Sequence, residues 1–169
     1  MANTIANLSR MATASIVVAL LVMGIKYLAY WATGSVALYS DALESIVNVV
    51  TAIAALVAIR ISARPADRRH QFGHHKAEYF SAVLEGVLII VAALLILHAA
   101  WDALKSPRAL TEPATGLAIN AVATVINAAW SWALIRFGRS WRSPALVADG
   151  WHLFADVATS VGVIIGLAL

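Results

Sequence analysis

Hydrophobic and polar positions along this chain fall into long blocks, with extended apolar runs separated by short polar links. A helix of about 20 apolar residues is long enough to cross the hydrocarbon core of a bilayer. The pattern therefore predicts an all-α, polytopic transmembrane helix bundle. Five spans are expected, at residues 11–31, 36–59, 77–100, 114–137 and 145–169.

Composition supports a membrane protein. Of the 169 residues, 62% are hydrophobic and 12% are charged, whereas about 25% are charged in a typical soluble domain. Cysteine is absent, which excludes disulfides and thiolate metal ligands. The net charge is +3, but the basic residues lie mainly in the links, where membrane topology explains them better than a nucleic-acid partner does.

The lysines and arginines of the links are distributed unequally between the two sides of the predicted membrane. If the amino terminus is cytoplasmic, nine of them lie inside and two outside, which is the bias that cytoplasmic loops carry. We therefore expect a cytoplasmic amino terminus. The inside set is Arg10, Arg60, Arg64, Arg68, Arg69, Lys76, Arg136, Arg139 and Arg142, and the outside set is Lys105 and Arg108.

Ionisable residues inside two of the spans indicate function. A charge within a membrane-spanning helix costs at least about 2.5 kcal/mol, and such residues usually face the bundle interior. In the fifth span, His152 and Asp156 are four residues apart and so share one helix face, and Glu44 and Asn48 repeat this spacing in the second span. Lys26, near the end of the first span, can extend its charged end to the membrane surface or have a functional role, and the sequence leaves both interpretations open.

The two pairs are expected to meet near the middle of the membrane. The second and fifth spans run in opposite directions, and Glu44 and His152 each lie about 11–12 Å from the nearer face at the helical rise. Glu44, Asn48, His152 and Asp156 can then close around one small cation. Two carboxylates balance a divalent charge, and one imidazole with three oxygens suits Zn²⁺, and also Fe²⁺, Co²⁺ or Mn²⁺. Metal and protons compete for these groups, so metal binding releases protons.

Three stretches of sequence, in order, carry a resemblance to a known family. They are GSVALYSDA at 34–42, PADRRHQFGHHKAE at 65–78 and ADGWHLFAD at 148–156. The chain resembles the cation diffusion facilitator family of divalent-metal transporters. The resemblance implies that Glu44, Asn48, His152 and Asp156 form the transport site, and that metal is exported from the cytoplasm in exchange for protons.

The same resemblance implies further features. Asp67, His70 and His74 match positions that bind a second ion in some members. Members have a sixth helix and usually a cytoplasmic domain that supports homodimers, so this chain is expected to be their amino-terminal transmembrane part, in a bacterial inner membrane. Members commonly have Asp or His where this chain has Glu44, and Asp where it has Asn48. The preference among Zn²⁺, Fe²⁺, Co²⁺, Cd²⁺ and Mn²⁺ is therefore not carried over. No prosthetic group is expected.

Other interpretations of the same residues stay open at this level. His152 and Asp156 are also compatible with a packed ion pair in a purely structural bundle. A membrane-embedded metalloenzyme is a second alternative, although no His-Glu-x-x-His motif is present. Asp41 and Asp149 either cap helix amino termini or orient the ligands through hydrogen bonds, and the latter is the favoured interpretation.

Overall fold

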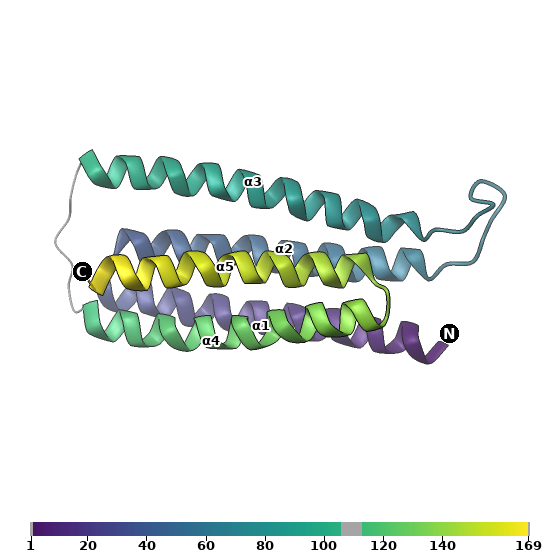
Figure 1. Ribbon diagram of the computed structural model, residues 1–169, viewed down its shortest axis with the longest axis horizontal. Coiled ribbons are helices and arrows are strands. Elements are labelled where there is room, and N and C mark those ends of the chain that lie inside the picture. Colours follow the sequence, from purple (N-terminus) through teal and green to yellow (C-terminus); the bar gives the residue numbers. More distant parts are fainter. Residues whose placement is uncertain (1, 106–112, 169) are drawn as a thin grey trace.

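The structure is a computed structural model that describes residues 2–105 and 113–168. Within these ranges the chain forms five helices and no strand, which confirms the all-α prediction. Figure 1 shows the helices lying side by side, with α2 and α5 running in opposite directions. The helices are α1 (Ala2–Thr33), α2 (Val36–Ser62), α3 (Lys76–Lys105), α4 (Pro113–Ser140) and α5 (Pro144–Ala168).

Short, well-defined turns set the antiparallel pairs. Gly34 ends α1 with a φ of 62°, a left-handed conformation that glycine adopts without steric cost. Ser35 then caps α2 by accepting a hydrogen bond from the backbone N–H of Leu38. Ser143 caps α5 in the same way, by accepting a hydrogen bond from the backbone N–H of Leu146. Pro144 occupies the first helical position, where its missing N–H costs nothing.

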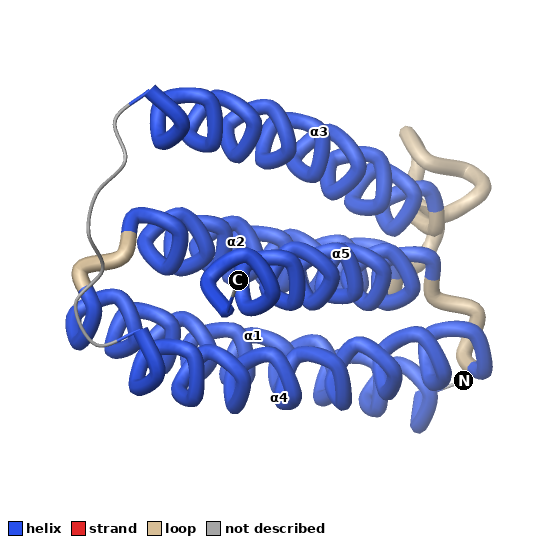
Figure 2. The backbone as a smooth tube through the Cα atoms, turned by 60° about the vertical axis from the view of Figure 1, so that its left-hand side comes forward, coloured by secondary structure: helices blue, strands red, loops and turns tan. Residues whose placement is uncertain are grey.

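The helices pack in three layers. Figure 2 shows α3 alone on one side, α2 and α5 in the middle, and α1 and α4 on the other side. Contacts between the helices agree with this order, since α3 packs on α2 and α5, while α2 packs on α1 and α5 packs on α4. α2 and α5 are therefore the helices best placed to form a site inside the bundle.

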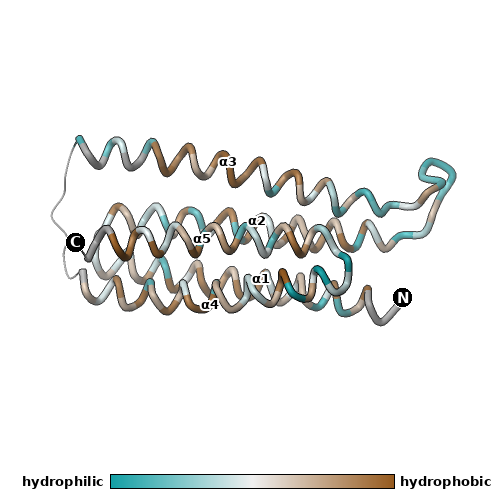
Figure 3. The backbone as a smooth tube through the Cα atoms, in the orientation of Figure 1, coloured by the Kyte–Doolittle hydropathy of each residue, from teal (hydrophilic) through white to brown (hydrophobic). Residues whose placement is uncertain are grey.

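The middle helices have their polar side chains inside and their apolar side chains outside. On α2, buried Asp41 and Asn48 lie opposite exposed residues such as Ile46 and Val50. On α5, Asp156 is buried while Phe154 is 52% exposed. This is the reverse of a water-soluble helix and fits a bundle that faces lipid. Figure 3 shows the hydrophilic colours gathered in the loop between α2 and α3 and in the turn between α4 and α5.

Four of the described helices are long and apolar enough to cross a membrane. They cover Ile5–Thr33, Val36–Ser62, Lys76–His98 and Ala114–Ser140. The fifth predicted span, 145–169, corresponds to α5, which is not among the four candidate spans found over the described residues. Its 25 residues pack along α2 and α4, and its crossing of the membrane stays a prediction.

Helices α4 and α5 approach each other most closely at a glycine of α5. A Cβ added at Gly150 would lie 2.7 Å from Ile135 Cγ1 and 3.0 Å from the Ile135 backbone nitrogen. The absence of a side chain at Gly150 therefore lets the two backbones come together and fixes the position of α5.

An apolar core lies near one end of the bundle. Its members come from α1, α2, α4 and α5 near the start of α1 and the end of α2, and they pack away from the polar residues of the middle helices. The core comprises Leu8, Ala12, Ala55, Leu56, Ile59, Leu134, Ala145, Leu146 and Leu153.

Candidate metal centre

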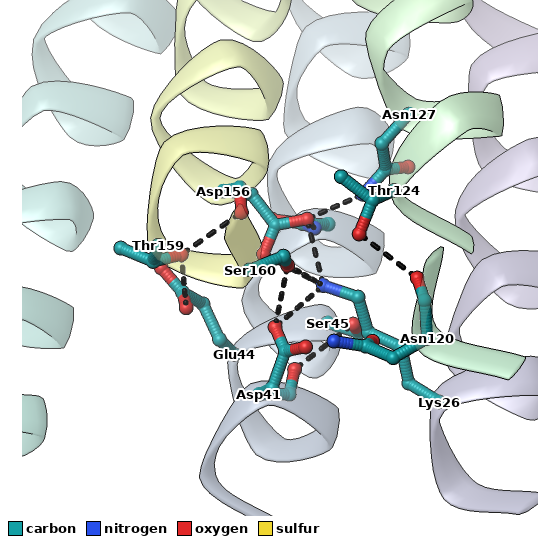
Figure 4. Close-up of polar contacts among 11 residues, drawn as sticks. Lys26, Asp41, Glu44, Ser45, Asn120, Thr124, Asn127, Asp156, Thr159 and Ser160 are labelled. Atoms are coloured by element: carbon teal, nitrogen blue, oxygen red, sulfur yellow. Dashed lines mark hydrogen bonds and ion pairs between the residues drawn. The ribbon is translucent and has the colours of Figure 1, made fainter. Parts of the chain in front are cut away.

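Asp156 lies at the centre of a buried polar cluster. Its exposed fraction is 0%, and its Oδ2 accepts hydrogen bonds from Asn48 Nδ2 at 3.1 Å and from Asn127 Nδ2. Lys26 Nζ lies 3.0 Å from each of its two carboxylate oxygens. Residues from α1, α2 and α4 thus converge on one carboxylate of α5 (Figure 4).

Lys26 does not extend to the membrane surface, which decides between the two interpretations that the sequence leaves open. Its side chain is 1% exposed and ends inside the cluster, 2.7 Å from Asp41 Oδ1 and 3.2 Å from Ser160 Oγ. A buried ammonium needs opposite charge and hydrogen-bond acceptors around it. Asp41 and Asp156 supply both, which explains why the side chain turns inwards.

Three carboxylates from two helices come together around this lysine. Asp41, Glu44 and Asp156 each offer an oxygen within 4.8 Å of the others, a spacing that suits a shared metal ion. Glu44 also accepts a hydrogen bond from Thr159 Oγ1 at 3.2 Å. The sequence assigned Asp41 to a supporting role, and here it belongs to the carboxylate group itself.

Glu44 is the most accessible of the three acids. It is half-buried, whereas Asp41 and Asp156 are buried. It lines a cavity of about 290 Å³ between α2 and α3, whose other walls are mainly apolar residues such as Leu88 and Leu95. A small ion in this cavity can therefore reach the acid cluster through Glu44.

The structure brings together three of the four predicted ligands. Asn48 donates a hydrogen bond to Asp156, and Glu44 is one of the three acids that cluster with Asp156. His152 is not among the residues whose ligand atoms lie within 4.8 Å of one another. His152 is one helical turn before Asp156, is 2% exposed, and neither ring nitrogen has a hydrogen-bond partner among the described residues. A buried imidazole without a partner is unusual and available as a ligand.

Other acceptor atoms of the cluster are also unpaired in the described part of the chain. Asp41 Oδ2 and Asn48 Oδ1 are buried without a hydrogen-bond partner. Buried polar atoms are normally satisfied, so unpaired acceptors beside three carboxylates indicate a place for a cation.

Asp149 makes a separate contact on the same face of α5. It is 1% exposed and accepts a hydrogen bond from Ser15 Oγ at 2.7 Å, and Ser15 in turn accepts one from Trp130 Nε1 at 3.2 Å. Buried Glu85 of α3 is near enough to Asp149 for their charges to interact. Asp149 therefore links α1, α4 and α5 and extends the buried polar face along α5.

A second group of potential ligands lies in the loop between α2 and α3. Asp67, His70 and His74 have ligand atoms within 4.8 Å of one another, with His70 Nδ1 3.1 Å from Asp67 Oδ1 and His74 Nε2 3.6 Å from Asp67 Oδ2. The backbone N–H of His70 donates to Asp67 at 2.7 Å and that of Arg69 at 2.8 Å. These bonds hold the pKa of Asp67 below its ordinary value.

Sequence reasoning missed three members of the cluster. Lys26 was left open between the membrane surface and a functional role, and Asn127 and Ser160 were given no role. The sequence did contain a signal for the position of Lys26. A lysine inside an apolar span needs a buried acid as a partner, and the other spans contain more acids than bases. The two polar residues of α4 and α5 carried no comparable signal, since hydroxyls and amides are common in membrane helices.

An apolar helix bundle with acids clustered in its interior is typical of integral membrane proteins that bind cations. Comparison with known families agrees, since residues 12–169 match the family described as "Cation efflux transmembrane domain". The chain belongs to this family of cation efflux proteins, which are transporters rather than enzymes.

Individual relatives fit this assignment. The chain is 52% identical over 158 residues to a Synechocystis protein named only as an uncharacterized transporter, sll1263, with 94% of this chain and 51% of the relative covered. It is 33% identical over 162 residues to the cation-efflux pump FieF of Serratia proteamaculans, covering 94% and 53%, and 33% identical over 165 residues to that of Escherichia coli, covering 95% and 54%. The chain spans about half the length of these relatives.

Proposed function

We propose that this protein exports a divalent metal cation, Zn²⁺ or Fe²⁺, from the cytoplasm in exchange for protons. The proposed ligands are Glu44, Asn48, His152 and Asp156, with Asp41 beside them. The observation that carries this proposal is the convergence of three carboxylates within 4.8 Å, inside a bundle whose outer surface is apolar. Similarity to proteins named cation-efflux pumps supports the same function.

The donor set fits a divalent ion of intermediate softness. Imidazole with carboxylate and amide oxygens binds Zn²⁺ and Fe²⁺ well, and Co²⁺, Cd²⁺ and Mn²⁺ are further candidates. Carboxylates and imidazole bind either a metal or protons, so loading the metal expels protons and protonation expels the metal. This competition couples the two fluxes without any prosthetic group.

Transport also requires the site to open to each side in turn. The apolar core that includes Leu8, Ile59 and Leu146 lies in the half of the bundle where α1 begins. The Glu44 cavity lies in the opposite half, beside the first half of α2. We propose that this conformation is the one closed to the cytoplasm, and that α2 and α5 move relative to the outer helices to open the other side.

The placement in the cell follows from the same proposal. The distribution of lysine and arginine supports a cytoplasmic amino terminus, and the relatives are bacterial, which supports the bacterial inner membrane.

A homodimer is proposed from the family resemblance, and no nucleic-acid partner is proposed. Asp67, His70 and His74 form a proposed second ion site on the cytoplasmic side.

Uptake into proteoliposomes under a pH gradient tests the function. We expect the purified protein to transport Zn²⁺ or Fe²⁺ faster than Mn²⁺, Co²⁺ or Cd²⁺, and to lose at least about tenfold of that rate on His152→Ala, the scale seen when a metal site is perturbed. His98→Ala is the matched control, because His98 is an exposed histidine at the far end of α3. If the unmodified protein and His152→Ala transport every ion at the same slow rate, the proposed function is wrong.

A further inference from the structure

The ammonium of Lys26 occupies the position where a cation would bind the carboxylate group. It contacts Asp41 Oδ1 at 2.7 Å, both oxygens of Asp156 at 3.0 Å and Ser160 Oγ at 3.2 Å. Ser160 Oγ also donates to Asp41 Oδ1 at 2.9 Å, which closes the ring of contacts. Lys26 therefore bridges two of the three carboxylates from a third helix, α1 (Figure 4).

From this geometry we infer that Lys26 is a tethered cation, which fills the carboxylate group when no metal is bound and which the transported divalent ion must displace. The inference rests on the proposed function and extends it to a residue that determines affinity and release. A lysine suits this task because its ammonium is a compact charge on a flexible four-carbon stem. An ammonium can therefore withdraw from the acids without unfolding α1.

The charges of the cluster support displacement. Asp41, Glu44 and Asp156 carry three negative charges, and Lys26 contributes one positive charge, so the four together have a formal charge of −2. A divalent ion carries twice the charge of the ammonium, so at the same distance the carboxylates attract it about twice as strongly as they attract Lys26. The ion can therefore take the place of the lysine at the acids.

The acceptors that Lys26 leaves unpaired indicate that it is not the final occupant. Asp41 Oδ2, Asn48 Oδ1 and both nitrogens of His152 have no partner among the described residues. An ammonium has three donors, and Asp41, Asp156 and Ser160 already receive them. A metal ion accepts four or more ligands, so it can engage donors that the lysine does not reach.

Competition between the lysine and the metal has two consequences for transport. Ion affinity is lower than three carboxylates alone would give, because binding must break the contacts of Lys26 with Asp41 and Asp156. Release is faster, because the lysine returns to the acids as the ion leaves. A site that holds its own counter-ion therefore avoids trapping the cargo.

Titration of the purified protein with Zn²⁺ and Co²⁺ by calorimetry tests the inference. We expect Lys26→Met, which keeps most of the side-chain length and removes the charge, to tighten binding at least about tenfold. In proteoliposomes the same variant should lower both KM and kcat, since uptake of the ion is favoured and release is slowed. Lys105→Met is the control, because Lys105 is exposed and its described contact is with Trp101. Unchanged affinity in Lys26→Met, with the control also unchanged, would overturn the inference.

A second comparison keeps the test decisive if Lys26→Met does not fold. In the Asp41→Asn variant, Lys26 keeps Asp156 as its ion-pair partner and the network has one acid fewer. Adding Lys26→Met to this variant then removes the charge of Lys26 from the smaller network. We expect the double variant to bind Zn²⁺ more tightly than Asp41→Asn alone, and equal affinity would reject the inference. If the unmodified protein binds neither ion and Asp156→Asn changes nothing, the proposed function itself fails. If the protein binds ions and Asp156→Asn abolishes binding, only the role of Lys26 is in question.

Discussion

The side-chain nitrogen of Lys26 lies 3.0 Å from both carboxylate oxygens of Asp156, although the two residues are 130 positions apart in the chain. This contact joins α1 to α5 inside a bundle whose exterior is apolar. Both side chains are buried, so each charge depends on the other.

Removal of Asp156 should therefore destabilise the bundle as well as abolish metal binding. Asp156→Ala leaves Lys26 with Asp41 and Ser160 as partners and takes the acceptor from Asn48 and Asn127. We expect a loss of about 3–5 kcal/mol in the free energy of unfolding, the usual cost of leaving a buried charge uncompensated. Thermal unfolding in detergent, followed by the fluorescence of the six tryptophans, measures the effect.

The control for this prediction is an exposed acid in a similar pair. Asp102→Ala breaks a contact of 3.3 Å with exposed His98, and we expect it to change stability by less than about 1 kcal/mol. If Asp156→Ala unfolds at the temperature of the unmodified protein, the ion pair contributes nothing to folding.

Much of this site could be predicted from residue spacing because helical periodicity fixes which side chains share a face. The spacing of Glu44 with Asn48 and of His152 with Asp156 correctly identified the inward faces of α2 and α5. Contacts between helices could not be predicted in the same way, since they depend on how each helix is rotated against its neighbours. His152 thus lies on the expected face yet outside the carboxylate group.

Lys26 shows a different limit of the sequence. A lysine near the end of a span can reach either the membrane surface or a buried acid, and the length of its side chain permits both. Only the positions of Asp41 and Asp156 on two other helices decide between them. The same holds for Asn127, whose amide carries no spacing signal of its own.

The close packing of α4 on α5 leads to a second prediction, which concerns the effect of a side chain at Gly150 on stability. A methyl group at this position would lie 2.7 Å from Ile135 Cγ1 and 3.0 Å from the Ile135 backbone nitrogen. Gly150→Ala should therefore push the helices apart and lower the free energy of unfolding by about 1–3 kcal/mol. Because His152 and Asp156 follow on the same helix, transport should fall too.

Gly162 provides a matched control on the same helix, since nothing lies within 4 Å of a Cβ added there. Gly162→Ala should be neutral or raise stability by up to about 1 kcal/mol, the difference in helix propensity. Thermal unfolding of the two variants side by side measures both effects. Equal stability of Gly150→Ala and Gly162→Ala would show that the approach at Gly150 does not constrain the fold.

The loop between α2 and α3 makes a prediction about pH. Backbone N–H groups of His70 and Arg69 donate to Asp67 and hold its pKa below the ordinary value, which is about 3.9. Since the pKa is lower in the folded loop than in an unfolded chain, the stabilising effect is complete above the ordinary value and is lost as the pH falls through the lowered one. An NMR titration of the Asp67 carboxyl carbon should give a midpoint below that of a short peptide of the same sequence. Matching midpoints would mean that these hydrogen bonds do not persist in solution.

The last prediction is that substitution of Asn48 changes the ion selectivity of the site. Its Nδ2 donates to Asp156 at 3.1 Å while its Oδ1 has no partner in the described structure. Asn48→Asp replaces a neutral oxygen ligand by a charged one and turns the contact with Asp156 into a repulsion when the site is empty. We expect the variant to favour binding of divalent ions and to change their order of transport, because an added carboxylate benefits harder cations such as Mn²⁺ most.

Transport rates of Zn²⁺, Fe²⁺, Mn²⁺, Co²⁺ and Cd²⁺ in proteoliposomes measure this change. Asn120→Asp is the comparison variant, since Asn120 is also a buried amide, on α4, and its side chain makes no hydrogen bond to Asp156 in the described structure. A change of order in Asn48→Asp with none in Asn120→Asp identifies Asn48 as a ligand. The same order in both variants removes Asn48 from the coordination shell and leaves it with the structural task of holding Asp156 in place.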